Sequence, residues 1–369
     1  MKSLWREAEA KKMVGAYARQ GVNKDLALRV YTTRLLGGDP RLVLHGGGNT
    51  SVKTRMKDVS GKTIDVLCVK GSGWDMGAIE PRGLPALRID ALQALRPLKA
   101  LSDEDMVDAQ RGALLDSTSP NPSVETLLHT FLPHKFIDHT HSTAVLAVTD
   151  QPDGDKIAAD IYGDRAALVP YVMPGFDLAI KAAEVYEANR DVEGLILLKH
   201  GIFSFGETAR EAYERMISLV TVAEDRLKTG RKKVFVSAAL PKKIASVADV
   251  APILRGLIAD NDGASEPKRM VLDFRTNKAI RTYVNGKEAA RYSQIGVVTP
   301  DHNIRTKNWP LLVAAPDAGD VPDFIKSTKK ACDKFAATSH KYFARHNGKR
   351  DAVKVELDTT PRVILVPGL

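Results

Sequence analysis

Hydrophobic positions recur with helical spacing in the first forty residues of the chain. Segments 4–19 and 24–36 both place apolar side chains three to four residues apart, and the second segment ends at Gly37-Gly38. Glycine often follows the last turn of a helix because it adopts the required conformation without a steric penalty. We therefore predict two helices at the start of the chain.

Short apolar runs and helical segments are interleaved through the middle of the chain. Consecutive or alternating apolar residues predict strands, and apolar spacing of three to four predicts helices. The predicted strands are 64–69, 136–141, 144–148, 194–198 and 201–205, and the predicted helices are 123–131 and 207–226. The second helix begins with a capping-box pattern at Thr208 and Glu211. Strands and helices in this irregular order favour an α/β sandwich over a doubly wound sheet.

Charge and composition shift at Pro241-Lys242-Lys243, which we interpret as a domain boundary. The sequence thus predicts a domain over 1–240 and a smaller α+β extension over 241–369. In the extension we expect helices at 247–258 and about 321–345, a proline-bearing loop at 299–309 and a last strand at 362–366.

Composition and charge narrow the classes of protein that remain. With 44% hydrophobic and 27% charged residues, the 369-residue chain is ordinary for a globular protein. Its formal net charge is +9, from 54 basic and 45 acidic residues. The basic segments 226–243 and 323–350 lack regularly interleaved aromatic residues that would stack on bases. We therefore expect attraction for small anions and no nucleic-acid partner.

The sequence also argues against a membrane or secreted protein. No apolar stretch is long enough to cross a bilayer, and residues 1–19 carry charges of both signs where a secretory signal would be apolar. Cys68 and Cys332 are too few for a disulfide framework or a thiolate metal site. We expect a cytoplasmic protein without membrane contact.

Histidine is scarce and unevenly placed, which makes three histidines candidates for a metal site. His139-Thr140-His141 puts two imidazoles on one face of a predicted strand, and His200 follows the apolar run 195–198. A single His-X-His is more often a hydrogen-bonded core pair. Three histidines at strand ends favour a divalent metal site with a fourth position open to substrate.

Glu125 is a candidate general acid or base. It precedes His139 on a predicted helix, and the apolar residues around it, Val124, Leu127 and Leu128, would raise its pKa. The alternative is an ordinary glutamate on a helix surface. Two glycine-rich turns, 48–51 and 70–73, could offer backbone amides to a phosphate, although neither is a P-loop or a dinucleotide-binding motif.

In order, these residues resemble the class II (metal-dependent) aldolase/adducin family over roughly residues 15–230. The resemblance implies an α/β/α sandwich around a mostly antiparallel sheet, assembled as a homotetramer. It also implies a divalent ion, commonly zinc, on His139, His141 and His200, with Glu125 moving the proton. Substrate phosphate would be bound by Asn49, Ser72, Gly73 and Ser123.

Segments 134–141, 299–307 and 361–369 more narrowly resemble the aldolase half of bifunctional rhamnulose-1-phosphate aldolase/short-chain dehydrogenase proteins. Whether this chain stands alone or is one half of a longer protein is left open. Val124 departs from the pattern, because smaller family members often have a phosphate-binding serine there. The loop residues His302, Arg305 and Lys307 are either ordinary surface charges or a lid that brings cations to the substrate. The family's catalytic tyrosine cannot be placed, although Tyr162 and Tyr171 are available.

Three functions remain open. The resemblance implies cleavage of a ketose 1-phosphate to dihydroxyacetone phosphate and an aldehyde. The same site could serve a sugar-phosphate or sugar-acid epimerase or decarboxylase, since the fold alone does not set the reaction. The third is a non-catalytic adducin-like binding protein, against which Glu125 and the three histidines argue.

Overall fold

The computed structural model describes residues 1–229, 236–259, 268–348 and 354–369. Contacts divide the chain into two units. The first is Met1–Gly230 with Val298–Asp301, and the second is Arg231–Val297 with His302–Leu369. Part of the basic segment 226–243 lies outside the described residues. Among the helices that are described, none combines the length and the apolar character needed to cross a membrane.

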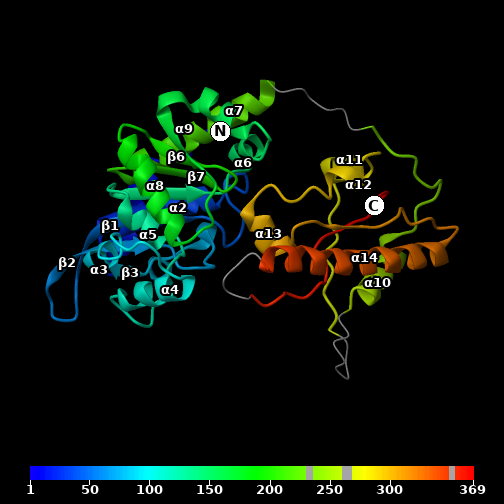
Figure 1. Cartoon of the computed structure of the whole chain (residues 1–369), viewed down its shortest axis with the longest axis horizontal. Helices are drawn as coiled ribbons and strands as arrows, with labels where there is room; N and C mark the ends of the chain where they lie inside the picture. Colours follow the sequence, from blue (N-terminus) through cyan, green and yellow to red (C-terminus); the bar gives the residue numbers. More distant parts are fainter. Residues whose placement is uncertain (230–235, 260–267, 349–353) are drawn as a thin grey trace. The chain divides into compact units, whose positions relative to one another are not determined.

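A seven-stranded sheet forms the centre of the first unit (Figure 1). Neighbouring strands are antiparallel except for the parallel pair β5–β6 at one edge. In spatial order the strands are β3 (Ala86–Arg88), β2 (Thr63–Val69), β1 (Asn49–Lys57), β4 (Phe136–Thr140), β7 (Gly201–Gly206), β6 (Gly194–Leu197) and β5 (Ala166–Val169). The predicted mostly antiparallel α/β architecture is confirmed.

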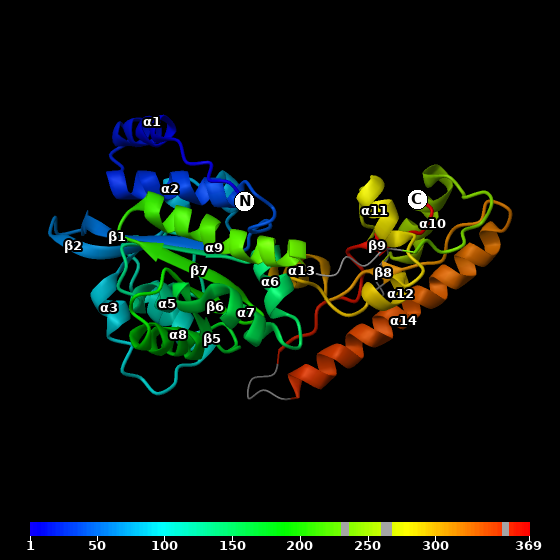
Figure 2. The same ribbon diagram turned by 90° about the horizontal axis from the view of Figure 1, so that it is seen from above.

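Helices cover both faces of this sheet (Figure 2). Leu67 and Val69 of β2 pack in the core cluster that contains residues of α5 and α8, whereas Val66 and Cys68 pack in the cluster that contains residues of α2. The alternation of side chains along a strand produces this division. The helices of the first unit are α1 (Glu7–Ala18), α2 (Lys24–Gly37), α3 (Ile89–Gln93), α4 (Asp103–Gly112), α5 (Thr126–Phe131), α6 (Thr143–Thr149), α7 (Gly154–Tyr162), α8 (Phe176–Ala188) and α9 (Ala209–Thr229).

The start of α9 has one of the two predicted capping-box bonds. The backbone N–H of Glu211 donates to Oγ1 of Thr208 at 3.1 Å. The carboxylate of Glu211 in turn accepts the backbone N–H of Glu207 at 2.8 Å. The first bond satisfies an amide group that the first turn of a helix leaves without a partner, and the second ties the residue before Thr208 to the helix.

Residues 144–148 form part of a helix, so the predicted strand there is wrong. The run is apolar at every position, and such a run fits a buried strand and a buried helix equally well. In α6 the side chains of Val145, Val148 and Thr149 are buried, which is the spacing of one helix face. This face belongs to the same core cluster as α9.

The second unit contains helices and a short parallel strand pair. Its core includes Val250 and Leu254 of α10, Leu311 of β8, and Phe324 and Phe335 of α14. Its elements are α10 (Val247–Leu257), α11 (Lys278–Val284), α12 (Ala289–Tyr292), α13 (Pro300–Thr306, of which Pro300 and Asp301 belong to the first unit), β8 (Leu311–Leu312), α14 (Val321–Asn347) and β9 (Ile364–Leu365).

Two predicted helices of this unit are confirmed, one predicted loop is wrong, and α11 and α12 lie where the sequence predicts short strands. α10 and α14 match the helices expected at 247–258 and 321–345, and β9 lies inside the expected strand 362–366. The expected loop at 299–309 instead contains α13. Pro300 suggested a loop, but proline is well tolerated in the first turn of a helix, where its missing N–H has no partner to lose.

Candidate metal centre and active site

Three buried histidines meet at the end of the central strands. His139 lies on β4, His141 follows it two residues later, and His200 lies in the turn between β6 and β7. One ring nitrogen of each can be chosen so that all three lie within 4.8 Å of one another. Nε2 of His139 is 3.0 Å from Nε2 of His141. Two ligand nitrogens of a tetrahedral zinc ion are about 3.3 Å apart, given Zn–N distances of about 2.0–2.1 Å, so this spacing suits such an ion.

The protonation states of the histidines also suit a metal. Burial lowers the pKa of His139 well below its usual value and the pKa of His200 to about 3, with Glu125 opposing the second shift. Nδ1 of His139 donates to the carbonyl of Ile202 at 3.1 Å, which leaves the lone pair on Nε2. The Nδ1–H of His141 donates to Oδ1 of Asp301 at 2.6 Å, which leaves the lone pair of His141 on Nε2 as well. The two Nε2 lone pairs, 3.0 Å apart, would repel unless a cation lies between them. We conclude that the donor set fits a divalent ion.

Glu125 completes this cluster from the residue before α5. Its side chain is buried, with Oε2 3.2 Å from Nε2 of His139 and Oε1 3.4 Å from Nε2 of His200. Among the described residues, Oε1 of Glu125 has no hydrogen-bond donor. Of the apolar residues expected around Glu125, Leu127 and Leu128 are buried, whereas Val124 is 46% exposed, and the carboxylate itself contacts polar groups.

Asn49 lies beside Glu125, in a buried network that includes a residue the sequence analysis missed. The Asn49 amide donates to Oε2 of Glu125 at 2.6 Å and to Oγ of Ser123 at 2.9 Å. Its carbonyl is 2.5 Å from Nε2 of His129, whose Nδ1 is 2.8 Å from Oγ of Ser51. His129 therefore holds the Asn49 amide toward Glu125. The spacing of Glu125 and His129, four residues apart, was the available signal.

The second glycine-rich turn lies next to this network. The backbone N–H of Ser123 donates to the carbonyl of Lys70 at 3.1 Å, and that of Ser72 donates to the carbonyl of Asn121 at 2.8 Å. Ser72 and Gly73 are exposed, and Gly73 has a φ of 76°. The structure thus brings the turn that carries Ser72 and Gly73 beside Ser123, while Asn49 bonds to Ser123 and Glu125.

Lys70 was not singled out from the sequence. Its side chain is 2% exposed, and Nζ lies 3.3 Å from the carbonyl of Gly46, between the two glycine-rich segments. A buried ammonium group at this position adds positive charge to the side of the site where the turns meet.

The remaining sequence candidates are three residues of the second unit and two tyrosines of the first. His302, Arg305 and Lys307 belong to the second unit, and Nζ of Lys307 is paired with Asp358. Their proposed lid role stays a prediction. Of the two tyrosines, Tyr162 is buried in the core cluster that includes α9 and burial raises its pKa, whereas Tyr171 is 54% exposed.

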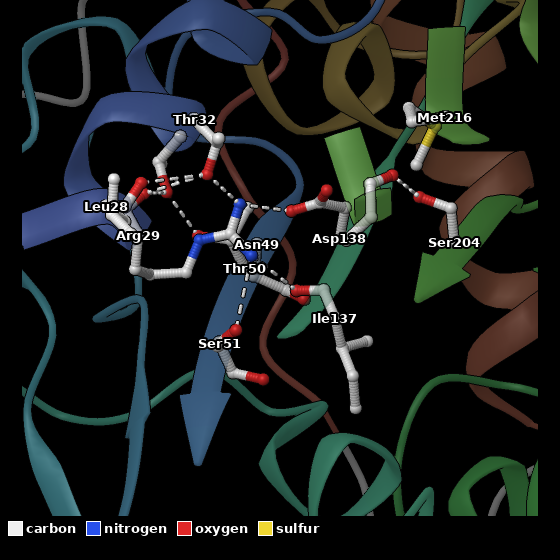
Figure 3. A network of polar contacts seen from close by, with 12 residues as sticks. Leu28, Arg29, Thr32, Asn49, Thr50, Ser51, Ile137, Asp138, Ser204 and Met216 are labelled. Atoms are coloured by element: carbon white, nitrogen blue, oxygen red, sulfur yellow. Dashed lines mark hydrogen bonds and ion pairs between the residues drawn. The ribbon is translucent and has the colours of Figure 1, made fainter. Parts of the chain in front are cut away.

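A buried ion pair lies on the opposite face of β4 from His139. Arg29 of α2 pairs with Asp138, and both side chains are fully buried. Nη1 of Arg29 also donates to the carbonyls of Ser51 at 3.2 Å and Ile137 at 3.3 Å (Figure 3). These contacts fasten α2 to β1 and β4, where Asn49 is the register partner of His139.

The family of the chain follows from comparison with known sequences. Residues 28–227 match the Class II Aldolase and Adducin N-terminal domain, which is more than half of the chain. The chain belongs to the class II aldolase/adducin family. Residues 245–369 match a second domain of class II aldolases. Class II aldolases are metal-dependent, in agreement with the three-histidine cluster.

Individual relatives show how far this class II aldolase domain extends. The N-terminal class II aldolase domain of a conserved Thermoplasma acidophilum protein is 39% identical with a TM-score of 0.55, covering 62% of this chain and 99% of that one. The "Uncharacterized oxidoreductase YuxG" of Bacillus subtilis is 36% identical over 92% of this chain. The chain spans about half the length of that relative, 49%.

A more distant structure is the L-fuculose-1-phosphate aldolase of Thermus thermophilus. It is 19% identical with a TM-score of 0.37, covering 56% of this chain and 99% of that one. At this distance the likeness carries no argument about the reaction.

Proposed function

We propose that this protein is a zinc-dependent aldolase that cleaves a ketose 1-phosphate, similar to rhamnulose 1-phosphate, to dihydroxyacetone phosphate and an aldehyde. The observation that carries the proposal is the position of Glu125, whose two oxygens lie 3.2 Å and 3.4 Å from Nε2 of His139 and His200. Reversible cleavage of a carbon–carbon bond next to a carbonyl needs an electrophile and an acid–base group side by side.

The chain's own residues divide the chemistry between them. A divalent ion on His139, His141 and His200 would supply a Lewis acid for the negative charge that develops on the carbonyl oxygen. Cleavage breaks the C3–C4 bond: its electron pair stays on C3 of the three-carbon fragment, and the C4 hydroxyl becomes the aldehyde as its proton passes to the Glu125 carboxylate. Glu125 then gives a proton to C3 of that fragment, and it removes this proton in the synthetic direction. The amide of Asn49 orients the Glu125 carboxylate for the transfer.

An anionic substrate is supported by the surroundings of Asn49 and Ser123. Ser72 and Gly73 expose amide and hydroxyl donors in a turn beside Ser123, and donors of this kind bind phosphate. The buried ammonium of Lys70 adds charge of the right sign. Val124 in place of a serine reduces the number of hydroxyl donors, so the phosphate contacts rest on the other positions.

The proposal extends to the protein's context. We infer that the chain corresponds to the aldolase half of the bifunctional rhamnulose-1-phosphate aldolase/dehydrogenase proteins. The support is its match to about half of a Bacillus subtilis relative that is called an oxidoreductase. The resemblance further implies a cytoplasmic homotetramer of carbohydrate metabolism, and sedimentation velocity would measure the mass of that assembly.

The test is a panel of ketose 1-phosphates, including rhamnulose and fuculose 1-phosphates, incubated with the Zn²⁺-loaded full chain. We expect dihydroxyacetone phosphate to form with at least one of them, measured by its NADH-coupled reduction. Glu125→Gln is the inactive control, and Glu207→Gln, which changes an exposed carboxylate, is the matched active one. Epimerised substrate without dihydroxyacetone phosphate would assign the site to an epimerase, and CO₂ released from a sugar acid added to the panel would assign it to a decarboxylase. A Zn²⁺-loaded protein that changes no substrate in the panel would contradict the aldolase.

A further inference from the structure

Asp301 is a buried carboxylate to which the sequence analysis gave no role of its own. Its side chain is 2% exposed. By its contacts it belongs to the first unit, in the segment Val298–Asp301. By its sequence it lies within 245–369, the range that matches the second family domain. A residue of the second matched range therefore packs among residues of the first.

Both oxygens of Asp301 are used inside the first unit. Oδ1 accepts the Nδ1–H of His141 at 2.6 Å. Oδ2 accepts the backbone N–H of Leu44 at 2.9 Å. A proton on Nδ1 leaves the lone pair of His141 on Nε2, the atom that lies 3.0 Å from Nε2 of His139. The carboxylate thus sets both the tautomer and the ring orientation of one member of the histidine cluster.

The backbone at Gly47 leaves the space that the carboxylate occupies. A Cβ added to Gly47 would lie 1.8 Å from Oδ1 and 2.5 Å from Oδ2 of Asp301. Gly47 is not among the glycines with positive φ, so an alanine fits its backbone and would clash with Asp301. The loop and the carboxylate are therefore matched in shape as well as in hydrogen bonding.

We propose that Asp301 is a positioning residue for the metal centre, holding Nε2 of His141 toward His139 and His200. The inference rests on the metal centre of the proposed function and deepens it. A carboxylate that accepts the distal N–H of a metal-binding histidine fixes its orientation and increases its basicity, and losing it commonly costs about 10- to 100-fold in metal affinity. The first matched range alone would then hold an incompletely ordered ligand set.

The test measures Co²⁺ binding by the full-length, metal-free protein, with Co²⁺ as a probe visible through its absorption. We expect Asp301→Ala and Gly47→Ala to raise the Co²⁺ dissociation constant by roughly 10- to 100-fold. Asp301→Asn should lose less Co²⁺ affinity, because the amide oxygen of asparagine can still accept the Nδ1–H of His141. Asp273→Asn, at an exposed ion pair with Arg275, is the matched control and should bind Co²⁺ as the wild type does.

If Asp301 acts only in folding, the metal-free variants should have lower unfolding temperatures, but their Co²⁺ affinities should not fall in the order expected above. Should Asp301→Ala fail to fold, Asp301→Asn and Gly47→Ala decide the matter. If the wild type binds Co²⁺ through His141 and all three variants bind it equally well, the role of Asp301 is overturned while the metal centre stands. If the wild type binds no Co²⁺, or His141→Ala binds it unchanged, both are overturned. Normal Co²⁺ binding without aldol cleavage would refute the reaction alone.

Discussion

The guanidinium of Arg29 and the carboxylate of Asp138 pair inside the protein, each completely shielded from solvent. Asp138 and His139 are adjacent on β4, so the pair and the histidine cluster occupy opposite faces of one strand. Burial raises the pKa of the Asp138 carboxyl while Arg29 opposes this shift. The pair therefore ties helix α2 to the strand that carries the candidate ligands.

Asp138→Ala should strongly destabilise the first unit. The substitution leaves the guanidinium of Arg29 buried without its counter-charge, and breaking a buried pair in this way costs about 3–5 kcal/mol. Urea unfolding followed by circular dichroism would measure the loss. Asp65→Ala is the matched control, since its pair with Arg55 is exposed and should contribute less than about 1 kcal/mol. Equal unfolding midpoints for the two variants would show that the buried pair contributes no more to stability than the exposed pair.

Glu125→Gln should lower kcat by on the order of a hundredfold or more, because proton transfer to carbon requires the carboxyl group. Metal content should stay near that of the wild type, since the three histidines remain. Stopped-flow kinetics with metal analysis of the same sample would check both. A variant with nearly normal kcat would remove Glu125 from the mechanism.

His141→Ala should abolish most metal binding and most activity together. The substitution removes one of three nitrogens and leaves Asp301 without its imidazole partner. Elemental analysis after dialysis against a fixed free Zn²⁺ concentration would measure the stoichiometry. His340→Ala, at an exposed ion pair in the second unit, is the comparison and should retain metal. Full metal content and turnover in His141→Ala would contradict the ligand assignment.

Ser72→Ala and Asn49→Ala should have different kinetic effects. Ser72 lies in an exposed turn, so its loss should mainly raise KM for a phosphorylated ketose, which carries the phosphate in both ground and transition states. Asn49 also bonds to Glu125, so its loss should lower kcat as well. A lost hydrogen bond to a charged group, about 1.5–3 kcal/mol, corresponds to roughly 10- to 150-fold in kcat/KM. The unphosphorylated ketose is the control. If it is cleaved equally well and both variants are silent, the anion is not recognised here.

Lys53 predicts a pH dependence of stability. Burial lowers its pKa to about 7, with Glu207 opposing, whereas an unfolded lysine titrates near about 10.4. Between these values the unfolded chain binds more protons, so Lys53 makes the free energy of unfolding rise with pH, by at most about 1.4 kcal/mol per unit. Lys53→Met should therefore flatten the profile measured by urea unfolding at pH values from about 7 to 9. Lys57→Met, at an exposed position on the same strand, should leave the profile unchanged. If the free energy of unfolding has the same slope against pH in both variants, the effect of Lys53 is refuted.

The histidine cluster could be anticipated from the sequence because its spacing follows local rules. Two histidines at i and i+2 on a strand share a face whatever the rest of the fold does, and His200 follows a recognisable apolar run. The helix at 143–149 could not be recognised, because an apolar run carries no period. What decided its structure was packing in the core cluster with α9.

Asp301 and His129 could not be assigned for a different reason. Asp301 bonds to His141 across 160 residues, and no local pattern specifies such a contact. His129 bonds to Asn49 across 80 residues of sequence. Such pairings depend on the complete topology of the sheet, so residues that orient the site from a distance stay hidden in a single sequence.

The position of β4 in the sheet has a kinetic consequence. His139 is the register partner of Asn49 on one side and of Phe203 on the other. These ladders close chain segments of 139 − 49 = 90 and 203 − 139 = 64 residues. Closing such long segments costs conformational entropy before the contacts between the strands can offset it, and this slows folding. The first unit therefore has a high contact order and should fold slowly for its size. The imidazole of His139 is positioned in the site only after both strand pairings have formed, late in the folding of the chain.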